Sequence, residues 1–156
     1  MSTLSNPLQS VIQTAIQREI DANTMYGNAA KLASTPNGRD LLLEMAAQEQ
    51  GHRNRLEAML KGDTFKVLSK KQQKQVVDLK ITDYLVEEPL SADSDLQTIL
   101  IVAGKREKGS FELYSAMARV AGDPETVKLF EFLANEELTH KRRVEVMYDE
   151  LVYLDN

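Results

Sequence analysis

The sequence predicts an all-α fold, a four-helix bundle made of two duplicated helical hairpins joined by a long crossover. Laying residues 15–60 over residues 103–148 without a gap gives 14 identities in 46 positions, at a constant displacement of 88 residues. Four segments carry apolar residues at steps of three and four, the period of a helix buried along one side. We expect the 156 residues to form one domain.

Capping residues and prolines delimit the four predicted helices. A capping residue followed by proline opens three of them, which we expect over about residues 7–33, 36–60 and 124–154. The third in chain order, over about 95–121, opens at Ser94, which with Gln97 resembles a capping box. Because the links inside each pair are short, each pair is predicted to be an antiparallel hairpin.

The connector between the hairpins covers about residues 61–94. A short helix is expected near residues 69–79, followed by an extended stretch at 81–86 and a turn at Pro89. At up to about 3.3 Å per residue, the connector can pass along a whole helix of about 36 Å. The second and third long helices would then be parallel. A simple up-and-down order is the alternative, and the sequence allows both.

Each of the four apolar seams carries one glutamate near its middle. Two of these glutamates stand alone, and the other two precede a histidine by three residues, a spacing that places both side chains on one helix face. The candidate ligands are Glu19, Glu49, His52, Glu107, Glu137 and His140. An isolated glutamate on a helix is usually a surface residue, but apolar neighbours along the seam favour an inward position for Glu19 and Glu107. If the four helices are in register, the four carboxylates would meet inside the core.

Such a cluster predicts a metal centre. Four buried carboxylates cannot all remain ionised without cations, because desolvation and mutual repulsion both oppose their charge. Two divalent ions would balance the four charges. Carboxylate and imidazole ligands suit two iron ions (Fe²⁺/Fe³⁺), with manganese or zinc as other occupants. The chain has no cysteine, which excludes thiolate metal sites and disulfides.

Three further side chains have two interpretations each. Tyr26 and Tyr114 are either ordinary core aromatics or hydrogen-bond donors to carboxylates on neighbouring helices. Glu136 lies four residues before His140 and could share its face. Its repeat counterpart is Gln48, however, so Glu137 is the favoured ligand.

Composition limits the partners and the location. The formal net charge is −5, which opposes binding to nucleic acid. The longest apolar stretches are too short to span a membrane, and the first residues lack the pattern of a secretory signal. We therefore expect a soluble, cytoplasmic protein that binds neither nucleic acid nor membrane.

Four stretches, at residues 18–26, 46–52, 106–114 and 133–140, resemble the ligand helices of the rubrerythrin family of ferritin-like di-iron bundles. The resemblance implies a non-haem di-iron oxidoreductase that reduces hydrogen peroxide or dioxygen with electrons from an external donor protein. It also implies a homodimer, and the long connector could let hairpins exchange between chains. The alternatives are a ferroxidase or iron-storage protein and a metal-free structural bundle.

The chain departs from the family pattern in two ways. It has no cysteines, so it lacks the rubredoxin-type iron domain that rubrerythrins usually carry. The family also commonly has an extra carboxylate three residues after the first glutamate of the third helix, where this chain has Ser110.

Overall fold

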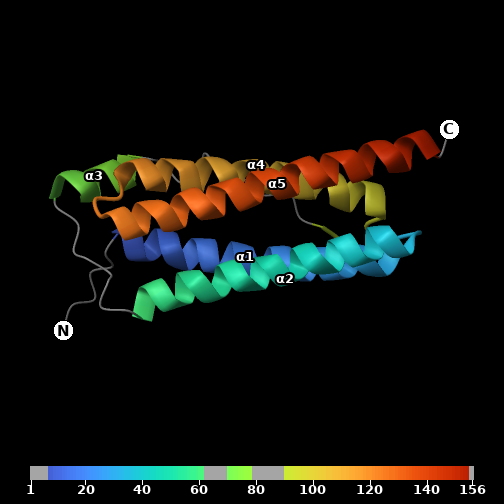
Figure 1. The fold of residues 1–156 in the computed structure, drawn as a ribbon, viewed down its shortest axis with the longest axis horizontal. Coiled ribbons are helices and arrows are strands. Elements are labelled where there is room, and N and C mark those ends of the chain that lie inside the picture. Colours follow the sequence, from blue (N-terminus) through green and yellow to red (C-terminus); the bar gives the residue numbers. More distant parts are fainter. Residues whose placement is uncertain (1–6, 62–69, 79–89, 155–156) are drawn as a thin grey trace.

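The computed structural model describes residues 7–61, 70–78 and 90–154. They form the helices α1 (Pro7–Leu32), α2 (Pro36–Lys61), α3 (Lys70–Asp78), α4 (Leu96–Val120) and α5 (Pro124–Leu154), and Figure 1 shows the four long ones side by side. The bounds of the long helices lie within one residue of those expected from the sequence. The expected extended stretch at 81–86 and the turn at Pro89 lie outside the described residues.

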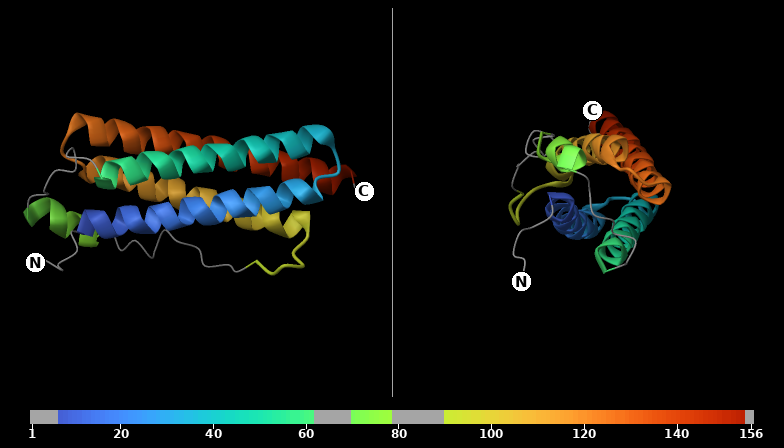
Figure 2. Two further views of the ribbon diagram at one scale, coloured as in Figure 1. Left: turned by 90° about the horizontal axis from the view of Figure 1, so that it is seen from below. Right: turned by 90° about the vertical axis from the view of Figure 1, so that its left-hand side faces the viewer.

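The two hairpins are joined so that α2 and α4 run in the same direction (Figures 1 and 2). The described parts of the connector lie at opposite ends of the bundle. At one end, Gln72 of α3 donates a hydrogen bond to the carbonyl oxygen of Val120 at 3.5 Å. At the other end, Leu90 packs against the apolar cluster that contains Ala30 and Leu42. The crossover is therefore confirmed, and the up-and-down alternative is wrong.

One predicted helix start needs a correction. The N-cap of α4 is Asp95, whose Oδ1 accepts a hydrogen bond from the backbone of Thr98 at 2.8 Å, and not Ser94. Ser94 instead accepts a hydrogen bond from the backbone N–H of Ser91 through its hydroxyl. A carboxylate at this position also interacts favourably with the positive end of the helix dipole, which explains why the neighbouring aspartate takes the cap.

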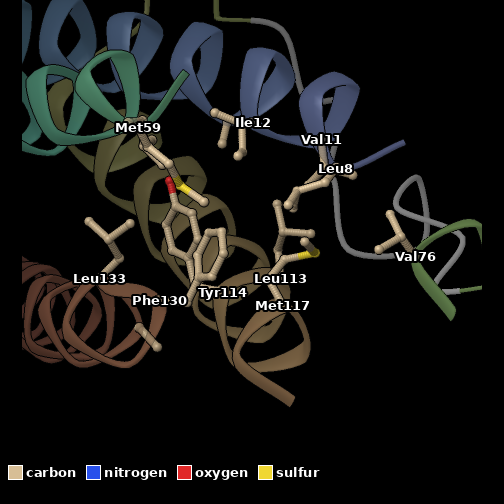
Figure 3. Close-up of a cluster of buried hydrophobic side chains, with 13 residues drawn as sticks. Leu8, Val11, Ile12, Met59, Val76, Leu113, Tyr114, Met117, Phe130 and Leu133 are labelled. Atoms are coloured by element: carbon tan, nitrogen blue, oxygen red, sulfur yellow. The ribbon is translucent and has the colours of Figure 1, made fainter. Parts of the chain in front are cut away.

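The core consists of two apolar clusters, one toward each end of the bundle. The first includes Ile12, Leu113 and Phe130 and is drawn in Figure 3. The second includes Met45 and Val144. Between them, near the middle of the four long helices, lies a layer of buried polar side chains. Within the described residues, no helix combines the length and apolarity needed to cross a membrane.

Candidate metal centre

The buried polar layer contains all six side chains predicted as ligands. None of them exposes more than 2% of its surface. They come from four different helices: Glu19 from α1, Glu49 and His52 from α2, Glu107 from α4, and Glu137 and His140 from α5. The interpretation of Glu19 and Glu107 as surface glutamates is therefore wrong. Both carboxylates point inward because each lies on the buried face of its helix, in line with buried alanine and tyrosine side chains.

The six side chains form two overlapping groups of four. One group is Glu19, Glu49, His52 and Glu137, and the other is Glu49, Glu107, Glu137 and His140. Within each group, the ligand atoms all lie within 4.8 Å of one another. Glu49 and Glu137 belong to both groups. The arrangement thus offers two adjacent cation positions, each with its own glutamate and histidine, that share two carboxylates.

Both histidines turn Nδ1 toward the carboxylates. Nδ1 of His52 lies 2.8 Å from Oε1 of Glu137 and 3.5 Å from Oε2 of Glu19. Nδ1 of His140 lies 2.7 Å from Oε1 of Glu49. The two imidazole rings are nearly parallel, with centroids 5.9 Å apart and an interplanar angle of 20°. The two halves of the repeat therefore direct the same nitrogen atom, Nδ1, of each histidine toward one shared group of carboxylates.

The outer nitrogen atoms of the histidines face two residues that sequence reasoning did not assign to the site. Nε2 of His140 lies 2.6 Å from Oε1 of Gln48. Because an amide oxygen can only accept, this contact places the proton on Nε2 and leaves the Nδ1 lone pair directed at the carboxylates. Nε2 of His52 faces Oε1 of Glu136 at 3.5 Å. Gln48 and Glu136 are repeat counterparts, which is the sequence signal that could have identified them.

Each of the six candidate ligands has at least one buried atom without a hydrogen-bond partner. These seven atoms are Oε2 of Glu19 and Glu107, Oε1 of Glu49 and Glu137, Nδ1 of His140, and both ring nitrogens of His52. An unpaired buried polar atom costs about 1–3 kcal/mol, and more if it is charged, so a cluster of seven calls for a ligand. Four carboxylate oxygens and two imidazole nitrogens make a donor set that fits two metal ions.

The pKa values of the buried carboxylates show how burial and mutual repulsion act on their negative charges. Burial, followed by the negative charges of Glu107 and Glu19, raises the pKa of Glu49 well above its ordinary value. The same causes raise the pKa of Glu137. Burial also opposes the charge of Glu107, but its close contacts with Glu137 and His140 outweigh burial and lower the pKa of Glu107. Without cations, burial and mutual repulsion therefore oppose the negative charges of Glu49 and Glu137.

The two tyrosines satisfy both interpretations given by the sequence. The rings of Tyr26 and Tyr114 belong to the two different apolar clusters. The hydroxyl of Tyr26 on α1 donates to Oε1 of Glu107 on α4 at 2.7 Å, and that of Tyr114 on α4 donates to Oε1 of Glu19 on α1 at 2.7 Å. Burial and the neighbouring carboxylates raise the pKa of both hydroxyls well above the ordinary value. Each tyrosine therefore stays a hydrogen-bond donor that fixes a carboxylate of the other hairpin.

Replacing Tyr26 or Tyr114 by phenylalanine is expected to destabilise the fold. A hydrogen bond to a charged group contributes about 1.5–3 kcal/mol, and removing the hydroxyl leaves a buried carboxylate oxygen unpaired. Chemical denaturation monitored by circular dichroism measures this loss of unfolding free energy. Tyr153→Phe is the matched control, because Tyr153 is 78% exposed. An equal loss in all three variants would contradict a specific role for the two buried hydroxyls.

The four long helices with a crossover, and the carboxylate and histidine layer at their middle, define a ferritin-like bundle of the carboxylate type. A family model described as Rubrerythrin matches residues 10–148 of the 156. The chain therefore belongs to the rubrerythrin family. A search of curated proteins and a search of solved structures each found no match. The family and the buried cluster together suggest metal binding.

Proposed function

We propose that this protein is a non-haem di-iron oxidoreductase that reduces hydrogen peroxide or dioxygen. The observation that carries the proposal is the sharing of Glu49 and Glu137 by two buried groups of ligands. A single ion would not need both groups, whereas two ions held side by side would. Family membership supports the same chemistry, and iron is the preferred metal because the reaction needs a change of oxidation state. Manganese and zinc are alternative occupants.

In this proposal, Glu49 and Glu137 would be shared by two ions, one of which would also be held by Glu19 and His52 and the other by Glu107 and His140. When bound, the two ferrous ions would supply the two electrons that reduce the oxidant. The protein side chains would hold the two ions next to each other inside the bundle. Tyr26 and Tyr114 hold the terminal carboxylates in orientation through their hydroxyl groups.

The electrons that regenerate the reduced centre come, in this proposal, from a donor outside these 156 residues. The chain contains no cysteine, so it cannot provide a rubredoxin-type iron site of its own. Mixing the oxidised protein with candidate reduced iron–sulfur or flavin proteins, and following reoxidation of the donor, identifies the class of partner.

Rapid mixing of the ferrous protein with hydrogen peroxide tests the proposed reaction. The absorbance change that accompanies iron oxidation is expected to be fast in the wild type and at least about 100-fold slower in Glu49→Ala, since that variant lacks a ligand of both ions. Glu131→Ala, which changes an exposed glutamate of α5, is the control. Equal rates in the wild type and Glu49→Ala would reject the proposal.

The oligomeric state stays a prediction. Resemblance to the family implies a homodimer, whereas an iron-storage role would require a closed shell of many chains. Sedimentation velocity distinguishes these two states directly. A large shell, combined with retention of many iron atoms per chain, would favour iron storage over peroxide reduction.

Replacing Gln48 by leucine is expected to weaken mainly one of the two metal positions. Gln48 fixes the proton on Nε2 of His140, and losing such a partner of a ligating histidine typically costs about 10- to 100-fold in metal affinity. Stepwise titration with a divalent ion, followed by calorimetry, should show one weakened and one nearly unchanged step. Equal weakening of both steps would contradict the pairing of Gln48 with a single position.

A further inference from the structure

A cavity of about 170 Å³ opens between α1 and α4 beside the metal centre. A single water molecule needs only roughly 10–15 Å³ of such space, so the cavity can hold a small molecule. Its inner wall is formed by the four glutamates of the cluster. Arg18, Arg106 and Ser110 are among the residues that line the rest. The cavity is thus a route along which a small ligand could reach the buried carboxylates.

Arg18 is held in this cavity with part of its hydrogen-bonding capacity unused. Its Nη2 donates to the carbonyl oxygen of Arg106 at 3.3 Å and to Oγ of Ser110 at 3.4 Å. Its Nε is buried and has no hydrogen-bond partner. A guanidinium remains charged in proteins and has no acceptor group, so the unused donor can be satisfied only by a ligand with a lone pair.

The charge of the cavity depends on the metal centre. Two arginines and five carboxylates line it, the fifth carboxylate being Asp21, which gives a net charge of −3 when all are ionised. Two divalent ions would change this value to +1. The Oδ1 atom of Asp21 accepts a hydrogen bond from Gln17 at 3.0 Å. With two divalent ions bound, the lining would therefore attract one negative charge, and without them this net positive charge is missing.

We propose that this cavity binds one small monovalent anion beside the occupied metal centre, with the Arg18 guanidinium as the cationic wall of the site. This inference rests on the proposed di-metal function. Arg18 Nε would donate to the anion, while Ser110 holds the guanidinium in place through Nη2. Comparison of the two repeats supports a specific role for Arg18. Its repeat counterpart is Arg106, and the counterpart of Ser110 is Ala22, which has no hydroxyl group to hold Arg106 in the same way.

Calorimetric titration with azide tests the inference on protein loaded with two equivalents of Zn²⁺, which prevents redox chemistry. The loaded wild type is expected to bind one azide per chain, and the metal-free protein none. Arg18→Gln should weaken azide binding by about 10- to 100-fold, the value of a hydrogen bond to a charged group. Arg39→Gln, a control that removes the same charge from an exposed position of α2, should leave the affinity unchanged.

Metal content, measured on every sample, separates the two proposals. A wild type that holds no metal would overturn the proposed function itself. Unchanged azide affinity in Arg18→Gln at wild-type metal content would overturn only the anion site. If Arg18→Gln loses the metal, a crystal structure of the loaded wild type soaked in azide decides. Azide within hydrogen-bond distance of the Arg18 guanidinium supports the site, and azide bound elsewhere, or not at all, overturns it.

Discussion

Replacing Glu49 by glutamine is expected to abolish tight binding of both metal ions, whereas replacing Glu19 by glutamine is expected to abolish only one. Glu49 belongs to both groups of ligands, and Glu19 belongs to one. Removing one partner of a buried charge pair costs about 3–5 kcal/mol, which corresponds to a loss of affinity of more than about 100-fold. Equilibrium dialysis followed by elemental analysis measures the number of ions per chain.

The two halves of the repeat provide internal controls for this experiment. Glu137→Gln should behave like Glu49→Gln, and Glu107→Gln should behave like Glu19→Gln. Glu131→Gln removes a charge from the exposed side of α5 and should retain both ions. Equal losses in Glu19→Gln and Glu49→Gln would contradict the assignment of Glu49 as a shared ligand.

Removal of the metal is expected to reverse the pH dependence of stability. In the metal-free protein, the pKa values of Glu49 and Glu137 are raised by burial and by neighbouring carboxylates. Groups with a raised pKa stabilise the fold at low pH, and this contribution is lost as the pH rises through their folded-state pKa. The pKa of His52 is also raised, since contacts with Glu19 and Glu136 outweigh burial, and it acts in the same direction.

Above the ordinary glutamate pKa of about 4.3, the metal-free protein should therefore melt at a higher temperature as the solution becomes more acidic. Glu107 has a lowered pKa and acts in the opposite direction, but only below the ordinary glutamate range of about 4.3. The metal-loaded protein should show the reverse trend, because protons compete with the ions for the ligands.

The size of the metal effect is measurable by calorimetric melting with and without a chelator. A ligand at 1,000 times its Kd stabilises the folded state by about 4 kcal/mol. For a chain of this length, that corresponds to about 8–16 °C in the melting temperature near neutral pH. Parallel pH trends in the loaded and metal-free samples would contradict the electrostatic account of the cluster.

The sequence predicted the bundle and the six clustered side chains because both follow from periodicity. When the apolar seam of a helix is buried, the glutamate within that seam is buried with it. The repeat then shows which glutamates of the two hairpins are equivalent. It did not predict the contact between Gln48 and His140, which joins residues of two different hairpins. Such a contact depends on how each helix is rotated about its axis, and spacing along one chain segment does not determine that rotation.

Two other features also required the structure. The connector was long enough for either helix order, and the packing of Leu90 and α3 at opposite ends of the bundle decided between them. The start of α4 was misplaced by one residue, because Ser94 and Asp95 both have side chains that can cap a helix. Both residue types are good helix caps, and the helix-dipole contribution that favours aspartate is too small to fix the start of a helix from sequence.

X-ray absorption spectroscopy of the iron-loaded protein, with iron content measured on the same sample, tests whether two iron ions bind side by side in the buried cluster. Two buried groups of ligands that share two carboxylates should hold two iron ions per chain. Each iron should then have a second iron at about 3.5–4 Å. One iron or fewer per chain after full reconstitution, or iron without a neighbouring iron, would contradict the account.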